Sequence, residues 1–172
     1  GFQPDLTWIK DRSEGNWHNL YDVVRGVTKR IFSNTNGAEE TQAQGLTAFG
    51  TDGFTVGSNV DVNKNGNNYV AWNWKAGGSG TTNNDGSIQS TVSVNNTAGF
   101  SIVAFNGNSG TVGHGLGVKP NFIVVKSRQT GGSNNWVVAH SALGTNMNDN
   151  YITLNLTGAA GSSSNTWGGE PT

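Results

Sequence analysis

The feature that most restricts the fold of this chain is a motif that occurs twice, at residues 1–10 and 117–126. The first copy reads GFQPDLTWIK and the second reads GVKPNFIVVK, and in each the final lysine is followed by one polar residue and an arginine. Proline fixes φ and has no amide hydrogen, so it suits the start of a strand and not its middle. We therefore expect each motif copy to begin a β-strand.

The spacing of the two copies sets the size of the repeat. The second copy starts at Gly117, 116 residues after Gly1, which is longer than one coil of a solenoid and long enough for a domain. The sequence predicts residues 1–76 as the later part of one repeat unit, 77–87 as a Gly/Ser/Asn-rich connector and 88–172 as the earlier part of the next. The two parts either form separate partial domains or pack together as one sandwich. Because the chain begins inside a repeated motif, we also expect it to be a fragment of a longer protein.

Short segments with a period of two predict strands along the whole chain. The clearest are residues 69–74, 88–94 and 99–105. Turn residues recur about every 8 to 12 residues, and no long helical pattern is present. A short helical turn is an alternative at residues 21–31, where Gly26 disfavours it, and in the polar loop at 38–43. The sequence therefore predicts an all-β fold, an antiparallel β-sandwich or jelly roll.

The composition excludes several classes of function. Charged residues make up 12% of the chain, against about 25% in an average globular protein. The net charge of −1 provides no basic surface, so we expect no nucleic-acid partner. The absence of cysteine excludes thiolate catalysis and Cys-ligated zinc. No apolar run approaches about 18 residues, so we expect no membrane insertion.

Residues 61–66 match the first half of a calcium-binding loop, D-x-N-x-N-G, with Asp61, Asn63 and Asn65 as the candidate ligands. Such a loop needs a bidentate carboxylate at its twelfth position, which is Trp72 here. Asn65-Gly66 is also a strong turn signal between two strand-like segments. We favour a plain β-hairpin and keep a bound Ca²⁺ as the alternative, and we expect no other cofactor.

Tryptophan supplies the candidate binding residues. Trp72 and Trp74 lie on the same face of the predicted strand 69–74. Large aromatic side chains mostly bury their area, so we favour a core position for both. The alternative is a platform on which sugar rings stack. For that function Trp17 and Trp136, which occupy corresponding places after the two motif copies, are further candidates.

The residues with catalytic potential form no recognisable set. His18, His114 and His140 lie on different segments, and none has a second ligand at metal spacing. For His18 and His140 we expect hydrogen-bonded structural roles. The chain has no Gly-x-Ser-x-Gly motif, and the pair Glu39-Glu40 lies in a polar loop. We therefore expect no enzymatic activity.

Seven short segments, in this order, carry a resemblance to a known family. They read GFQPDLTWIKDR, LYDVVRG, DGFT, YVAWNWKA, DGSI, GFSIV and HGLGVKP, and they begin at residues 1, 20, 52, 69, 85, 99 and 114. Together they resemble the repeated module of large structural and tail-fibre-like proteins of bacteriophages, especially marine ones. The resemblance implies a β-sandwich similar to concanavalin or laminin-G domains and a location on the virion surface, outside the cell. It supplies no catalytic residue.

From the residues and the resemblance we expect a non-enzymatic structural or adhesion module of a phage appendage such as a tail fibre. Its expected partners are copies of itself in a homo-oligomer, other virion proteins and a host-surface glycan used in host attachment. The alternative is a lectin-like carbohydrate-binding module that uses its Trp and Asn side chains. We expect a ligand site in the Gly/Asn-rich loops rather than on strand faces, because loops on a rigid scaffold commonly carry recognition.

Overall fold

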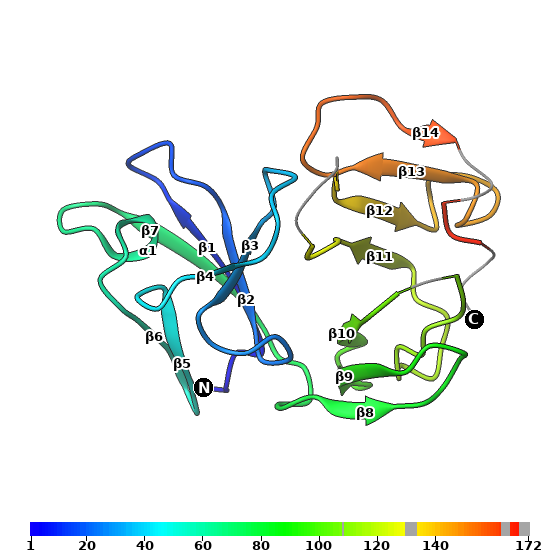
Figure 1. The fold of residues 1–172 in the computed structure, drawn as a ribbon, viewed down its shortest axis with the longest axis horizontal. Helices are drawn as coiled ribbons and strands as arrows, with labels where there is room; N and C mark the ends of the chain where they lie inside the picture. Colours follow the sequence, from blue (N-terminus) through cyan, green and yellow to red (C-terminus); the bar gives the residue numbers. More distant parts are fainter. Residues whose placement is uncertain (108, 130–133, 163–165, 169–172) are drawn as a thin grey trace. The chain divides into compact units, whose positions relative to one another are not determined.

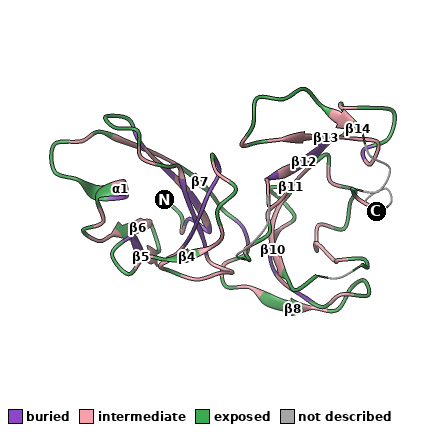
Figure 2. Ribbon diagram, turned by 45° about the horizontal axis from the view of Figure 1, so that its top comes forward, coloured by how far each residue is buried: buried purple, intermediate pink, exposed green. Residues whose placement is uncertain are grey.

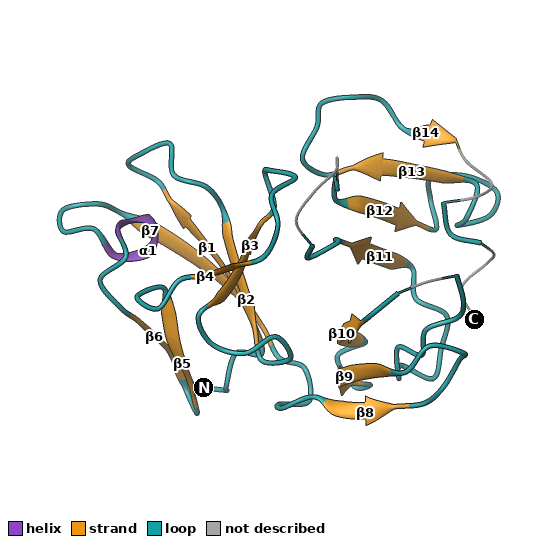
Figure 3. Ribbon diagram, in the orientation of Figure 1, coloured by secondary structure: helices purple, strands orange, loops and turns teal. Residues whose placement is uncertain are grey.

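Strands form along the whole chain, as the period-two segments predict (Figure 1, Figure 3). The computed structural model describes residues 1–107, 109–129, 134–162 and 166–168. Within these ranges the only helix is the single turn α1 (Val60–Asn63), and no helix there is long and apolar enough to cross a membrane. The strands are β1 (Leu6–Asp11), β2 (Asn19–Asp22), β3 (Lys29–Phe32), β4 (Glu40–Thr41), β5 (Leu46–Gly50), β6 (Gly53–Val56), β7 (Tyr69–Trp74), β8 (Thr81–Asn83), β9 (Ser90–Asn95), β10 (Phe100–Phe105), β11 (Phe122–Val125), β12 (Val137–His140), β13 (Asn150–Thr153) and β14 (Gly161–Ser162).

The predicted all-β fold with antiparallel sheets is confirmed. The described chain divides into two compact units. Unit 1 contains residues 1–31 and 40–117, and unit 2 contains residues 32–39 and 118–172. The jelly-roll connectivity and the division into repeat units stay predictions.

The largest sheet is built around the first motif copy. It has five strands in the order β4-β3-β2-β1-β7. Strand β1 is therefore paired on both sides, with Ile9 opposite Asn19 of β2 and opposite Ala71 of β7. Every second residue of β1 is buried, which places Thr7, Ile9 and Asp11 on one inner face.

The core of unit 1 lies against this inner face. Ile9 and Tyr21 of the sheet pack with Leu46 of β5 and Val62 of α1, and each of the four is at most 4% exposed. The partly buried side chains around them are Phe49, Phe54, Val56, Tyr69 and Ala71. The β5–β6 hairpin and α1 thus form a second layer on the sheet, and the buried residues are coloured purple in Figure 2.

Unit 1 also contains a three-stranded sheet in the order β10-β9-β8. Strands β9 and β10 pair along their whole length, from Ser90 opposite Phe105 to Asn95 opposite Phe100. The segment 77–87, for which the sequence predicts a connector, includes strand β8 and passes close to β9. A Cβ atom on Gly77 would lie 2.4 Å from a carbonyl oxygen of β9, so only glycine fits there.

Unit 2 contains a four-stranded sheet in the order β11-β12-β13-β14. Its buried residues include Val138 and Ala139 of β12, together with Trp136 and Met147. The indole N–H of Trp136 donates to the carbonyl oxygen of Phe32 at 2.7 Å. This bond attaches the segment 32–39 to the sheet.

The two motif copies form equivalent hairpins. Each strand begins two residues after the motif proline, β1 at Leu6 after Pro4 and β11 at Phe122 after Pro120. The prediction that each copy begins a strand is therefore confirmed. Strand β1 then pairs with β2 in the same antiparallel manner as β11 pairs with β12.

The tryptophans that follow the motif copies are not structurally equivalent. Leu6 pairs with Asp22 and Phe122 pairs with His140, so Asp22 and His140 hold corresponding places in the two hairpins. Trp136 lies four residues before His140, and the residue four before Asp22 is His18, not Trp17. Both tryptophans lie just before the second strand of their hairpin, Trp17 two residues before β2 and Trp136 one residue before β12. Trp136 is 5% exposed and Trp17 is 50% exposed.

The predicted hairpin at Asn65-Gly66 is wrong. Asn59 caps α1 by accepting a hydrogen bond from the backbone N–H of Asp61, so residues 60–63 form a helical turn in place of a strand. Gly66 does turn the chain, with φ of 85°. Strand β7 then pairs with β1, which is distant in sequence. A turn signal shows where the chain bends and not which strand the next segment joins.

The two segments with a helical alternative contain no helix. Residues 21–31 form the end of β2, a turn and the start of β3, and the Asp22 carboxylate closes the turn by accepting the backbone N–H groups of Val24 and Arg25. The Arg25 guanidinium pairs with the same carboxylate, and both side chains are buried. Residues 38–43 contain strand β4.

Asp5, the acidic residue after the first motif proline, fixes the start of β1. Its side chain is 2% exposed. Its carboxylate accepts the backbone N–H groups of Ala76 at 2.7 Å and Gly78 at 3.1 Å, and the side-chain amide of Gln3 at 2.9 Å. The carboxylate therefore joins the entrance of β1 to the chain that leaves β7.

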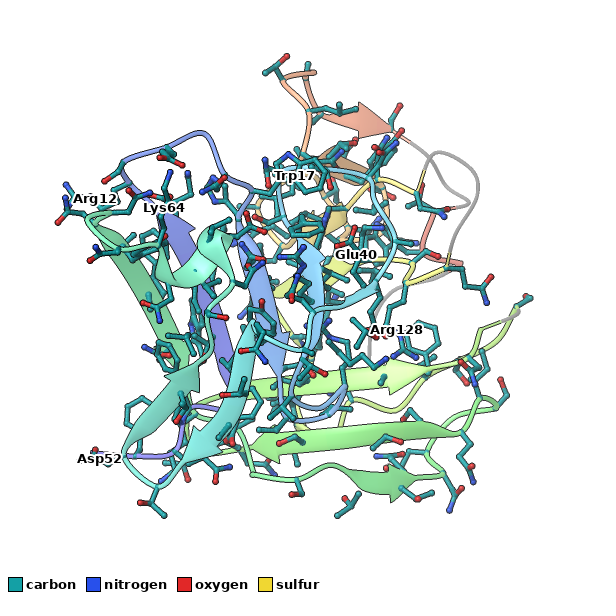
Figure 4. The ribbon with its side chains drawn as sticks, turned by 60° about the vertical axis from the view of Figure 1, so that its left-hand side comes forward. Arg12, Trp17, Glu40, Asp52, Lys64 and Arg128 are labelled. Atoms are coloured by element: carbon teal, nitrogen blue, oxygen red, sulfur yellow. The ribbon has the colours of Figure 1, made fainter. Side chains whose placement is uncertain are left out.

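We expect Asp5→Ala to lower the free energy of unfolding by about 2–4 kcal/mol, because two backbone amides lose a charged acceptor at a buried position. Chemical denaturation followed by tryptophan fluorescence measures the loss. Asp52→Ala is the matched control, since the Asp52 side chain lies at the β5–β6 turn (Figure 4) and is 77% exposed. The control should change stability by no more than about 0.5 kcal/mol. Equal losses in the two variants would contradict the structural role of Asp5.

Candidate functional site

A row of aromatic side chains lies on the outer face of the five-stranded sheet. Trp8 of β1 stands opposite Trp72 of β7, with ring centroids 5.7 Å apart in an edge-to-face arrangement. His18 lies on the β2 side of Trp8, with a centroid distance of 6.0 Å. Trp74 follows two residues after Trp72 and so shares its face. We call Trp8, His18, Trp72 and Trp74 the tryptophan face.

The predicted core position of Trp72 and Trp74 is wrong. Their exposed fractions are 46% and 36%. Tyr69 and Ala71, the alternate residues of β7, pack against the core, and the period of two turns both indoles to the other face. The sequence identified which residues share a face but not which face is covered.

Trp8 and His18 are joined by a hydrogen bond. The indole N–H of Trp8 donates to Nδ1 of His18 at 3.3 Å. Burial lowers the pKa of His18, and the positive charge of Lys10 lowers it further. The imidazole is therefore neutral at pH 7, which leaves Nδ1 able to accept this bond.

The lysine that ends each motif copy has a structural role. The Lys10 ammonium donates to the carbonyl oxygens of Asp11, Glu14 and Asn16, the last two at 3.1 and 3.0 Å. Lys126, its counterpart, likewise donates to the carbonyl oxygen of the next residue, at 2.7 Å. Lys10 therefore closes the loop after β1, whereas Lys126 also donates to the carbonyl oxygen of Asn36 at 3.3 Å and so contacts the segment 32–39.

Asp11 holds the β1–β2 loop from the inside. Its carboxylate accepts the backbone N–H groups of Ser13 and Glu14 and the side-chain amides of Asn16 and Asn67, at 2.8 to 3.2 Å. Burial by itself would raise the pKa of Asp11, but these four hydrogen bonds outweigh it and keep the pKa below its ordinary value. The carboxylate is fully committed to the loop and is not available to a substrate.

Three of the four candidate carbohydrate-binding tryptophans are open to solvent. Trp17 lies on the β1–β2 loop (Figure 4), and Trp72 and Trp74 lie on the tryptophan face. Trp136 is buried in unit 2, and its indole N–H is bonded to the carbonyl oxygen of Phe32. A buried indole offers no ring face for stacking.

The candidate calcium ligands do not share a centre. The Asp61 carboxylate accepts a hydrogen bond from Arg30 at 2.6 Å, and the side-chain amide of Asn63 donates to the carbonyl oxygen of Gly57 at 2.9 Å. Residues two apart on a helix do not face each other, and Asn65 lies in the turn beyond α1. Among the described residues no cluster of three or more acidic or histidine side chains is placed to hold a metal ion. The Ca²⁺ interpretation stays a prediction.

The acidic residues of the polar loop are separated by their basic partners. Glu40 and Asp61 both pair with Arg30, at 3.1 and 2.6 Å. Burial would lower the pKa of Arg30, but the hydrogen bonds to these two carboxylates outweigh it and raise the pKa. Glu39 pairs instead with Arg128 in unit 2, at 3.5 Å. Glu39 and Glu40, although adjacent in sequence, therefore pair with different arginines.

The fold and the site define a β-structured module with an open aromatic face and with carboxylates that are committed to structural bonds. The chain belongs to the family described as a domain of unknown function (DUF7483), whose model matches residues 1–172. No curated protein and no solved structure matches the chain.

Trp8 and His18 are members of the site that sequence reasoning did not group with Trp72. The period of two places Trp8 on the face opposite to Ile9, and that signal was readable. Trp8 lies next to Trp72 only because β1 pairs with β7, and no local sequence pattern predicts that pairing. His18 has the hydrogen-bonded role expected for it. His140 also does, since its Nδ1 accepts the backbone N–H of Ala142 at 3.0 Å.

We expect an NMR titration to give His18 a pKa below its ordinary value of about 6.5. Lys10→Gln should raise that pKa, because one positive charge is removed, without restoring the ordinary value, because burial is the larger cause. The folded state binds the proton less readily than the unfolded chain. The free energy of unfolding should therefore fall as the pH falls from about 6.5 through the folded pKa. A pKa of His18 above 6.5 would contradict the contact with Trp8 and Lys10.

Proposed function

We propose that this chain is a non-enzymatic structural and adhesion module of a phage virion appendage such as a tail fibre. In this role it assembles with copies of itself and binds a host-surface partner through the tryptophan face. The observation that carries the proposal is the open position of Trp72 and Trp74 beside Trp8 on a regular sheet. Tryptophan is enriched at binding surfaces because it offers a large, rigid contact area.

The polar groups support a structural role over a catalytic one. The buried carboxylates of Asp5, Asp11 and Asp22 each accept backbone N–H groups of their own loops or of neighbouring segments. A general acid or base must reach a substrate proton at hydrogen-bond distance. Carboxylates enclosed in this way are suited to hold turns in place.

A carbohydrate-binding module is the second candidate, and one observation favours it. Trp72 and Trp74 follow each other on one strand face, so their side chains are separated by about 7 Å along β7. Two successive indoles offer apolar rings to the C–H faces of neighbouring sugar residues in a glycan chain. This geometry favours the strand face over the Gly/Asn-rich loops as the ligand site, and the loop site stays a prediction.

We expect the full chain to bind one or more polysaccharides on a glycan array, and Trp72→Ala/Trp74→Ala to weaken binding at least about tenfold, because truncating a central aromatic contact commonly costs over 1 kcal/mol. Both side chains are partly exposed, so the double variant should keep its fold by circular dichroism. Trp17→Ala is the matched control, since Trp17 is equally exposed but lies on the loop.

The outcomes test the position of the binding site and the absence of enzymatic activity. Full binding by the double variant would remove the tryptophan face as the site, and loss of binding in Trp17→Ala alone would move the site to the loop. Release of new reducing ends from a bound polysaccharide would contradict a non-enzymatic function.

A further inference from the structure

We propose that molecules of this chain assemble head to tail through two open sheet edges, with β7 of one molecule pairing antiparallel to β11 of the next. This inference rests on the self-assembly part of the proposed function, and it specifies which strands form the contact between molecules. It does not involve the tryptophan face as a ligand site. It begins from a difference between the two equivalent hairpins.

The first motif strand has two partners and the second has one. Strand β1 is paired with β2 on one side and β7 on the other. Strand β11 is paired with β12, and within the described residues its other edge has no hydrogen-bonded strand. By the correspondence of the two hairpins, the open edge of β11 is the place that β7 occupies beside β1. A strand that resembles β7 and runs antiparallel to β11 is therefore expected to fit there.

The open edge of β11 presents its backbone groups outward. Ser141 donates its backbone N–H to the carbonyl oxygen of Asn121, which marks these residues as a hydrogen-bonded pair. Hydrogen-bonded and non-bonded pairs alternate along an antiparallel ladder. The N–H and C=O groups of Phe122 and Val124 therefore point away from β12, ready to pair with another strand.

Strand β7 has the complementary open edge. It is the last strand of its sheet. The N–H of Arg12 donates to the carbonyl oxygen of Asn68, which shows that these two residues are a hydrogen-bonded pair of the β1–β7 ladder. By the same alternation, the backbone groups of Tyr69, Ala71 and Asn73 point away from β1. Each of the two strands thus offers backbone donors and acceptors that have no strand partner among the described residues.

Both edge strands carry exposed apolar side chains. No residue of β11 is buried, although all four are apolar, and Phe122 and Val124 are 59% and 37% exposed. Its counterpart β1 has buried residues at every second position. On β7, Trp72 and Trp74 are the exposed residues of the same kind. Strand pairing would cover part of this apolar area.

Neither edge has the features that usually prevent an edge strand from pairing with a strand of another molecule. Edge strands are usually kept short or protected by charge, proline or a bulge. Strands β4, β8 and β14 are short edges of two or three residues, and β4 also carries Glu40. Strands β7 and β11 contain no charged residue and no proline. Strands β5, β6 and β10 are further uncharged edges, but they have no counterpart in the duplicated hairpins that would indicate a partner strand.

The proposed contact joins two different surfaces of the molecule. Such a heterologous contact leaves one edge unused at each end, so it builds rings or open filaments and not a closed dimer. That property makes the contact testable with two variants that each block one edge. Asn73→Pro removes an outward N–H of β7, and Val124→Pro removes an outward N–H of β11. Asn73→Ala is the control for the first variant, because it also loses the hydrogen bond from the Thr7 hydroxyl but keeps the backbone N–H and should assemble normally. Proline at an edge position that faces away from the existing partner is compatible with the strand.

Sedimentation velocity over a range of concentrations tests the proposal with the full chain. The unmodified chain should form oligomers that grow with concentration, and each proline variant alone should weaken association at least about tenfold. An equimolar mixture of the two variants should form a dimer and stop there, because each retains one usable edge. The pair Asn73→Lys and Val124→Lys repeats the test with charge where a proline variant fails to fold.

Leu156→Lys is the matched control on an exposed apolar residue outside both edge strands, and Phe105→Lys tests the edge of β10. Normal assembly by either proline variant alone, or loss of assembly only in Phe105→Lys, overturns the proposed contact while self-assembly stands. A chain that stays monomeric at every concentration overturns self-assembly as well. Glycan binding through the tryptophan face is measured separately and can survive both results.

Discussion

The hydrogen bonds from Ala76 and Gly78 to the buried Asp5 carboxylate determine where β1 meets β7, and much of unit 1 depends on that meeting. With β1 fixed at this point, Ile9 faces the core and Trp8 stands opposite Trp72. A slip of one residue would exchange the two faces of the strand. A single carboxylate thus helps to set both the buried layer and the aromatic surface.

Several of the charged residues form structural ion pairs. Asp22 and Arg25 close one turn, and Arg30 connects β3 to α1 through Asp61. Each pair joins segments that would otherwise have to be held by apolar packing alone. The large faces and the long strand edges are consequently poor in charge. Contacts made by such surfaces depend on packing and backbone pairing, and we expect them to be less sensitive to salt than contacts between charged surfaces.

Local patterns in the sequence were sufficient for the strands and insufficient for their partners. The period of two located β7 and β10, and proline located the entrances of β1 and β11. The same period could not show that the Tyr69 side of β7 is the covered one, because that depends on α1 and β5, which are distant in sequence or lack the pattern of a core element. The candidate site was therefore predicted in part. Trp72 and Trp74 were named, while Trp8 joins them only through long-range pairing.

The displacement between Trp17 and Trp136 shows how a duplicated hairpin can acquire different surfaces without a change in its strands. An insertion of an even number of residues in the connecting loop conserves the face that each later strand residue occupies. Trp17 and Trp136 both lie just before the strand that follows this loop, at positions that differ by one residue relative to it. In one hairpin the indole is displayed to solvent, and in the other it secures the segment around Phe32 to the sheet. Small changes in loop length can thus change which side chains repeats of this type expose to solvent, while the strand pairing stays the same.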